Sequence, residues 1–156
     1  KNIERMLRGF KQFNSLNKMD FIIVGTGMWK NQLNLDGLLK NVKFLGRKSG
    51  PELANWVSSS SALIYVSYFE GFGLPVLEGM LSGVPVVTSN LTSLPEVGGD
   101  SVIYVDPFNE DSISIGMEKA METNQELIDK AFLQAEKFSW DISALKVKDL
   151  LLNAMN

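Results

Sequence analysis

The sequence predicts an α/β protein built on a doubly wound parallel sheet. Short apolar runs rich in β-branched residues alternate with stretches whose apolar residues recur at helical spacing, a pattern typical of βα units. The predicted strands are apolar along their length, as expected where helices cover both faces of a sheet. A glycine-rich loop also follows the strand predicted at 62–67, at the sheet edge where parallel sheets bind ligands.

The first half of the chain supplies one helix and then strands and helices in alternation. The opening helix is predicted from apolar residues at helical spacing, namely Ile3, Met6, Leu7, Phe10 and Phe13. The elements expected after it are a strand at 21–25, a helix at 29–40 and a strand at 42–45. Pro51 then favours the start of a helix that ends near residue 58, because proline suits the first helical turn.

The second half continues the alternation and ends in helices. Ala62-Leu-Ile-Tyr-Val-Ser67 and Val84-Pro-Val-Val-Thr88 have the length and β-branched content of buried strands, and a helix beginning near Pro75 separates them. A short turn at 93–97 and a strand at 102–106 are expected next. Three helical stretches close the chain, at 110–121, 125–138 and 142–154.

The most informative segment lies between those two strands and reads Glu70-Gly-Phe-Gly-Leu-Pro-Val-Leu-Glu78. Gly71 and Gly73 let the backbone turn sharply and approach a ligand without a Cβ in the way. The amides around Phe72, Gly73 and Leu74 are expected to point out of a helix N-terminus, which suits phosphate. The segment therefore predicts an anion site.

The carboxylates of Glu70 and Glu78 fit a different part of such a ligand. Both can face one opening, since Glu78 falls about one turn into the helix. Carboxylates repel a diphosphate but accept hydrogen bonds from hydroxyls, so sugar and ribose hydroxyls are their expected partners. A structural interpretation stays open, with Glu70 as a solvated loop residue and Glu78 as a residue favoured near a helix N-terminus by the helix dipole.

At these residues the chain resembles family 4 of the glycosyltransferases, also called group 1. The match covers E-G-F-G-L-P-V-L-E-G-M-L-S-G-V-P-V-V at residues 70–87, and Gly79 departs from it because the family more often has alanine there. The resemblance implies a GT-B enzyme, in which two Rossmann-like domains enclose the active site and the C-terminal domain binds most of the donor. It implies that Glu78 binds the ribose hydroxyls and that Glu70, the expected catalytic residue, lies beside the transferred sugar.

The resemblance extends over nearly the whole chain and adds further expected contacts. Lys1 is expected to bind the donor diphosphate. Gly25 and Arg47, each just after a strand, are expected near the nucleotide, with a plain turn and a solvated side chain as their structural alternatives. Ser93 and Glu96 are expected in a loop near the cleft, where a structural cap is an equal alternative. Four aromatic residues are interpreted as packing residues and not as sugar platforms: Tyr65, Tyr68, Trp56 and Trp140.

The family's domain begins with a strand before its first helix, whereas this sequence starts in that helix. In a sheet of order 3-2-1-4-5-6 the missing first strand would be central. The expectation is therefore one Rossmann-like nucleotide-sugar-binding domain, residues 1–156, that is the C-terminal part of a longer enzyme and inactive alone. The N-terminal acceptor domain, which would bind a glycan, lipid or small-molecule acceptor and make any membrane contact, is absent from this chain.

Composition agrees with a globular domain and excludes several functions. The net charge of −3 gives no electrostatic argument for nucleic acid or an anionic membrane. The chain has no cysteine and no histidine, which excludes disulfides, a histidine or cysteine metal site and a Ser-His-Asp triad within it. No apolar run reaches transmembrane length and no signal peptide is visible. A cytoplasmic location is expected, with a peripheral position at the inner face of the membrane left open for the full enzyme.

Three functions follow in order. The first is the donor-binding domain of a retaining glycosyltransferase, with a nucleoside-diphosphate sugar as substrate and neither a metal nor another cofactor. The second is a noncatalytic nucleotide-sugar-binding or interaction module. The third, a flavodoxin-like receiver or regulatory domain, lacks the acidic cluster expected at the strand ends and leaves the match at 70–87 unexplained.

Overall fold

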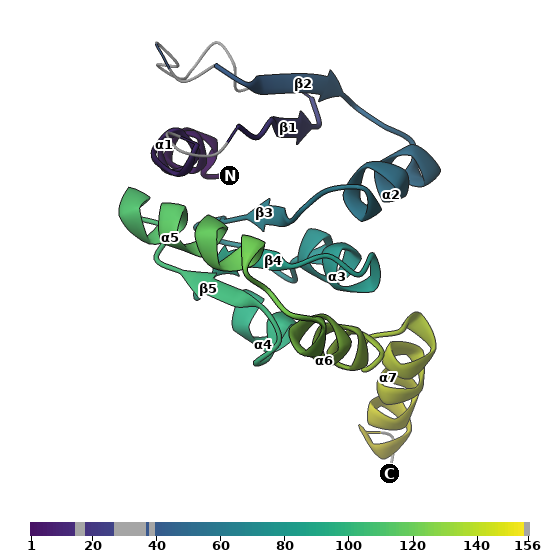
Figure 1. The fold of residues 1–156 in the computed structure, drawn as a ribbon. Coiled ribbons are helices and arrows are strands. Elements are labelled where there is room, and N and C mark those ends of the chain that lie inside the picture. Colours follow the sequence, from purple (N-terminus) through teal and green to yellow (C-terminus); the bar gives the residue numbers. More distant parts are fainter. Residues whose placement is uncertain (15–17, 27–36, 38–39, 155–156) are drawn as a thin grey trace.

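A computed structural model describes residues 1–14, 18–26, 37 and 40–154 (Figure 1). In chain order the elements are α1 (Ile3–Phe13), β1 (Phe21–Val24), β2 (Val42–Gly46), α2 (Gly50–Ser58), β3 (Leu63–Tyr65), α3 (Leu74–Leu81), β4 (Val86–Ser89), α4 (Leu94–Gly98), β5 (Ile103–Val105), α5 (Glu110–Met121), α6 (Gln125–Ala135) and α7 (Trp140–Ala154). The predicted α/β fold is confirmed. Most of the helix expected at 29–40 lies outside the described residues.

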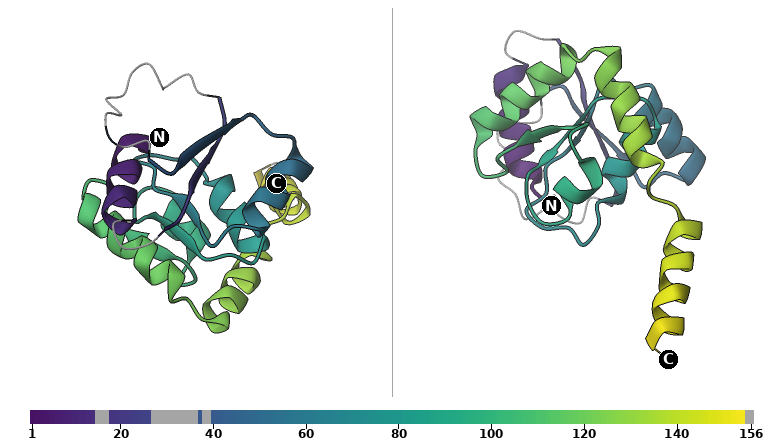
Figure 2. Two further views of the ribbon diagram at one scale, coloured as in Figure 1. Left: turned by 45° about the horizontal axis from the view of Figure 1, so that its top comes forward. Right: turned by 90° about the horizontal axis from the view of Figure 1, so that it is seen from below.

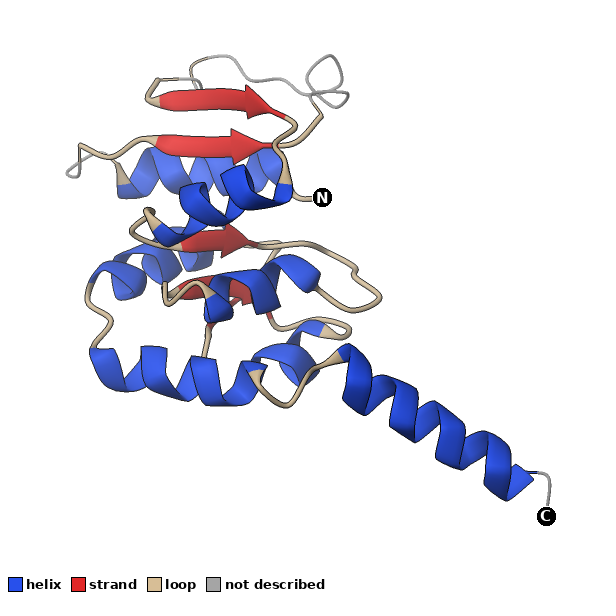
Figure 3. Ribbon diagram, turned by 90° about the vertical axis from the view of Figure 1, so that its right-hand side faces the viewer, coloured by secondary structure: helices blue, strands red, loops and turns tan. Residues whose placement is uncertain are grey.

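The described strands pair in parallel, as their apolar character predicts. They form two sheets, one of β1 and β2 and one in the order β3-β4-β5. The strands of the two sheets run in the same direction (Figure 3), so their carboxyl ends lie on one side of the molecule. The division falls between β1 and β3, where the order of a doubly wound sheet places its first strand.

Helices cover both faces of the β3-β4-β5 sheet (Figures 1 and 2). On one face, α1 and α5 pack against each other and against Val87. On the other, α3, α4 and α6 enclose Val86. Adjacent residues of β4 thus enter opposite cores, because successive side chains of a strand point to opposite faces. This burial on both sides explains why the strand sequences are apolar throughout.

The first helix links the two sheets. Leu7 of α1 is fully buried with Ile23 of β1. Met6 and Phe10 of the same helix are buried in the core that contains α5 and the β3-β4-β5 sheet. Since residues on different sides of α1 reach both sheets, this helix fixes its own N-terminus near the carboxyl ends of the strands.

Gly79 of α3 packs directly on the sheet. A Cβ at this position would lie 2.7 Å from Leu63 Cδ2 and 2.8 Å from Val86 Cγ2. These distances are shorter than a normal carbon contact, so the glycine lets α3 lie close to β3 and β4. The departure from alanine, expected from helix propensity to cost up to about 1 kcal/mol, is matched here by a local packing requirement.

Three predicted boundaries differ from the structure. Residues 94–98 form the short helix α4 where a turn was expected, with Pro95 in its first turn. Strand β3 ends at Tyr65 and not at Ser67, because its pairing with β4 stops at Tyr65 and Thr88. Helix α7 begins at Trp140, two residues earlier than predicted, and α6 ends at Ala135.

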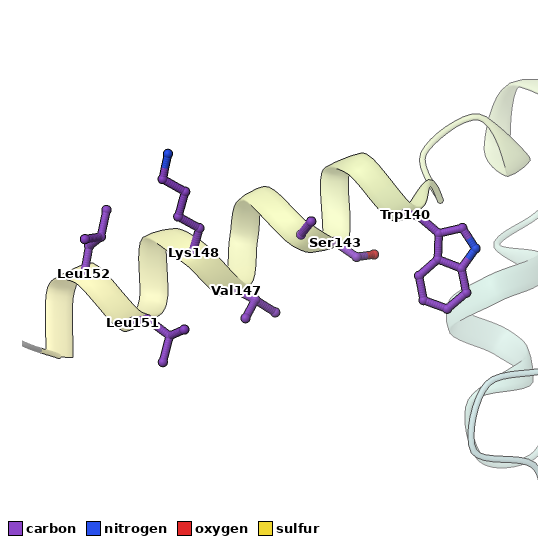
Figure 4. Close-up of a pocket in the computed structure, with 7 residues that line it drawn as sticks. Trp140, Ser143, Val147, Lys148, Leu151 and Leu152 are labelled. Carbon is purple, nitrogen blue, oxygen red and sulfur yellow. The ribbon is translucent and has the colours of Figure 1, made fainter.

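Helix α7 projects from the rest of the described chain (Figures 2 and 3). It has no buried residue, and Trp140 and Leu150 are 86% and 69% exposed. An open hollow of about 600 Å³ lies along it, lined by Trp140, Val147 and Leu151 among others (Figure 4). No helix among the described residues is both long and apolar enough to span a bilayer.

Candidate functional site

The loop at 70–73 connects the end of β3 with α3, and Gly73 sets its shape. Gly73 caps α3 with φ +106°, a left-handed conformation that glycine adopts at little cost. Its carbonyl accepts the amide of Val76 at 2.9 Å, and Pro75 lies in the first turn, as predicted. Since first-turn amides of a helix lack intrahelical partners, the Leu74 end of α3 offers hydrogen-bond donors beside this loop.

Two residues from the chain after β4 hold the loop in place. The Thr92 hydroxyl accepts the amide of Glu70 at 3.2 Å. The Ser93 hydroxyl lies 2.9 Å from the carbonyls of both Glu70 and Phe72, to which it can donate. Thr92 has φ +56°, which is uncommon for a β-branched residue and indicates that its neighbours impose the conformation. Ser93 thus braces the loop and does not cap α4 with its side chain.

Glu70 is joined to Lys1 and Tyr65 by a three-way polar contact. The Glu70 Oε1 atom accepts a hydrogen bond from the Tyr65 hydroxyl at 2.7 Å and one from Lys1 Nζ at 3.0 Å. Lys1 Nζ also donates to the Tyr65 hydroxyl and lies 4.2 Å from the centroid of that ring. The Glu70 side chain is 20% exposed, so solvent reaches the cluster without dispersing it.

The pKa of Glu70 lies below its ordinary value. Burial alone would raise this pKa, but hydrogen bonds from Tyr65, Ser67 and Lys1, with the Lys1 charge, outweigh it. The pKa of Lys1 is raised: partial burial opposes the charge, and contacts with Tyr65 and Glu70 more than compensate. Burial is also the main cause that raises the pKa of the Tyr65 phenol. At neutral pH the site therefore pairs a carboxylate with an ammonium.

This ion pair predicts a pH dependence of stability. A lowered Glu70 pKa contributes stability above the ordinary value of 4.5 and loses it as pH falls through the folded value. A raised Lys1 pKa contributes stability below 10.5 and loses it as pH rises through the folded value. The difference in thermal midpoint between the parent and Lys1→Met should hold at neutral pH and shrink in acid. A difference that persists after Glu70 is protonated would contradict the pairing.

Glu78 lies in the second turn of α3 with its side chain exposed. Its carbonyl accepts the Ser82 amide at 3.0 Å and the Ser82 hydroxyl at 2.7 Å, both ordinary helix-end contacts. The carboxylate is thus accessible to a ligand at the same helix whose first turn follows Gly73. The ribose role expected for Glu78 stays a prediction.

Gly25 and Arg47 follow the two strands of the other sheet. The Gly25 amide donates to the carbonyl of Gly46 at 2.9 Å, with Gly25 at φ +140°, so this glycine closes the end of β1 against β2. Arg47, directly after β2, is exposed. Both lie at the carboxyl ends of their strands, on the side of the molecule where β3 also ends. Their expected contacts with a nucleotide stay predictions.

Phe72 ties the loop to the segment before α7. Its ring packs edge to face on Phe138, with centroids 5.6 Å apart and an interplanar angle of 84°. Phe72 is still 39% exposed and Leu74 is 54% exposed, so part of the predicted donor-binding segment faces solvent.

The interpretation of two tyrosines as packing residues alone is wrong. Tyr65 packs with the α3 side of the core and also bonds Glu70 and Lys1 through its hydroxyl. Tyr68 accepts a hydrogen bond from Arg5 and stacks on Phe108 at 5.0 Å. The sequence signal that could have identified Tyr65 is its place at a strand end, five residues before Glu70.

The described residues contain no group of three or more carboxylates that could hold a metal ion. The expectation that transfer needs neither a metal nor another cofactor stays a prediction.

Comparisons with known proteins agree with the resemblance in the sequence. The family model described as glycosyl transferases group 1 matches residues 1–137. The chain is 33% identical over 151 residues to the O-antigen chain mannosyltransferase B of Escherichia coli, a match that covers 90% of this chain and 40% of that protein. It is 29% identical over 165 residues to an uncharacterized glycosyltransferase of Methanocaldococcus jannaschii, covering 99% of this chain and 42% of the relative.

A solved structure shares the fold. The sucrose-phosphate synthase of Thermosynechococcus elongatus superposes with a TM-score of 0.84 at 20% identity, and the match covers 99% of this chain and 42% of that one. The chain thus spans about two fifths of the length of the relatives it matches.

Proposed function

Because the chain belongs to the group 1 family of glycosyl transferases, we propose that it binds the sugar donor in a retaining transfer from a nucleoside-diphosphate sugar to an acceptor. The observation that carries the proposal is the Lys1–Tyr65–Glu70 cluster beside a loop that ends in the left-handed Gly73. A cation, a carboxylate and first-turn amides lie within one short segment of the fold. These groups suit the three chemical parts of such a donor.

Each group has a role in this proposal. Glu78 accepts the ribose hydroxyls, and Lys1 with the amides of Gly73 and Leu74 binds the diphosphate. Glu70 and the backbone at Phe72 and Gly73 lie beside the sugar. The segments at Gly25 and Arg47 then line the nucleotide end of the donor.

Departure of the diphosphate is the step that these groups would assist. Breaking the bond between sugar and phosphate builds negative charge on the leaving phosphate and positive charge on the sugar. Aligned amides and the Lys1 ammonium stabilise the first, and the Glu70 carboxylate stabilises the second. Because both charges grow toward the transition state, these interactions favour it over the bound donor.

Mannose is the proposed sugar. The support is that relatives of this chain carry mannosyltransferase in their names, among them two O-antigen chain enzymes. The acceptor would then be a growing glycan or its lipid carrier, which agrees with a role in polysaccharide synthesis.

We further propose that the chain works as part of a larger protein and is inactive alone. The relatives are about two and a half times as long, and the described strands leave a division where a central strand would fit. A preceding segment would supply that strand, and an N-terminal domain would bind the acceptor. Any contact with the inner face of the membrane would also come from that part, with the protein otherwise in the cytoplasm.

A noncatalytic module that keeps the donor site is the second candidate, favoured only by the absence of histidine in this chain. The two candidates differ in what precedes Lys1. An arginine shortly upstream and a glycine-rich N-terminal Rossmann-like half favour the enzyme, whereas their absence favours the module.

The test is a thermal-shift screen of the complete protein against nucleoside-diphosphate sugars that differ in base and sugar. A donor that binds the folded state raises the midpoint. In Glu78→Ala the affinity for that donor should fall about ten- to hundredfold, the usual effect of losing hydrogen bonds to a charged acceptor. Glu118→Ala, an exposed glutamate of α5, is the matched control and should bind as the parent does. Equal donor affinity in Glu78→Ala would contradict the ribose role.

A further inference from the structure

Tyr65 differs from its two partners in how firmly it is held. Lys1 reaches the cluster on a flexible four-carbon stem and is 56% exposed at its side chain. Glu70 belongs to a loop. Tyr65 is instead a residue of β3, half-buried, with its ring packed in the core beneath α3. A rigid phenol therefore stands between two more mobile charged groups.

The Tyr65 hydroxyl uses both of its bonding capacities in the cluster. It donates to Glu70 Oε1 at 2.7 Å and accepts from Lys1 Nζ. A phenol can do both at once, because its oxygen carries one hydrogen and accepting lone pairs. The oxygen of Glu70 that receives the phenol is also the one that pairs with Lys1 at 3.0 Å.

We propose that Tyr65 is a positioning residue, whose hydroxyl holds the Glu70 carboxylate in place beside the donor sugar and keeps Lys1 next to it until the diphosphate arrives. This rests on the proposed function. When Lys1 turns toward the phosphates, Glu70 loses a charged partner in a partly buried place. The bond from Tyr65 remains and keeps the carboxylate ionised and oriented. No proton leaves the phenol in this role, and no covalent bond forms or breaks at Tyr65.

Three groups face Glu70 among the described residues, namely the Lys1 ammonium, the Tyr65 phenol and the Ser67 hydroxyl. Each of them lowers the Glu70 pKa, against the effect of burial. Removing the phenol oxygen leaves burial less opposed, so the Glu70 pKa should rise. A ring that served only for packing would have no such effect when its hydroxyl is removed.

The experiment compares Tyr65→Phe with Tyr68→Phe in the complete protein. Tyr68 is the matched control, because it is also a half-buried tyrosine near the same edge but accepts from Arg5 and not from Lys1. The Glu70 pKa is followed without donor through the carboxyl carbon of labelled glutamate, assigned by its loss in Glu70→Gln. Thermal unfolding confirms that both variants fold. Donor turnover is then measured across pH.

Tyr65→Phe should raise the Glu70 pKa and lower kcat by about tenfold, the usual weight of a hydrogen bond to a charged group. Tyr68→Phe should leave the Glu70 pKa at the parent value. A Glu70 pKa that does not move in Tyr65→Phe overturns the inference, whatever happens to turnover. A raised pKa in a protein that binds no donor supports the contact between Tyr65 and Glu70 and counts against the proposed function.

Discussion

Glu70→Gln is expected to lower kcat by about a hundred- to a thousandfold, the range found when one preorganised electrostatic group is removed from an active site. Glutamine preserves the volume and can still accept from Tyr65, so the fold should survive. What is lost is the negative charge that would stabilise a cation-like sugar. Lys1 also loses its charged partner at 3.0 Å.

Turnover of the stabilising donor in the complete protein measures this effect, with Glu118→Gln as the control for removing a surface carboxylate. The KM for donor should change much less than kcat, because the lost interaction strengthens toward the transition state. A parent-like kcat in Glu70→Gln would leave Glu70 as a structural residue of its loop.

Gly73→Ala is the change expected to disturb the site most through the backbone. Gly73 adopts φ +106°, and a Cβ there would lie 2.6 Å from Leu94 Cδ2. The Leu94 side chain is fully buried, so its end cannot move freely. An alanine at this conformation costs about 1–3 kcal/mol of strain, and relief of that strain would turn the first amides of α3 away from the diphosphate.

Gly71→Ala is the internal control, since a Cβ at Gly71 meets nothing within 4 Å and its φ is not in the left-handed range. Chemical denaturation should show a lower free energy of unfolding for Gly73→Ala and a parent-like value for Gly71→Ala. Donor affinity should fall in Gly73→Ala as well. Equal stability of the two variants would show that the left-handed turn is not required.

The regular elements followed from local pattern. Helix α5 begins and ends at the predicted residues 110 and 121, because its apolar side and its Asn109 cap are both local features. Strand β3 was predicted too long, since Val66 is fully buried but lies beyond the pairing with β4. Apolar content reports burial, whereas a strand boundary depends on a partner elsewhere in the chain.

The site was predictable where it is continuous in sequence. The glycine at the start of α3 and the proline after it were both identified from the segment itself. Tyr65 and Thr92 were not, because their partners lie 64 and 22 positions away. Contacts of this kind arise only when α1 and the chain after β4 are folded against the end of β3.

The most direct test of the acid pair is a crystal structure of the complete protein with the nucleoside-diphosphate sugar that stabilises it most. The account predicts ribose hydroxyls at the Glu78 carboxylate, the diphosphate at the Gly73 and Leu74 amides and Lys1, and the sugar beside Glu70. A donor bound elsewhere, or one that touches neither carboxylate, would contradict it.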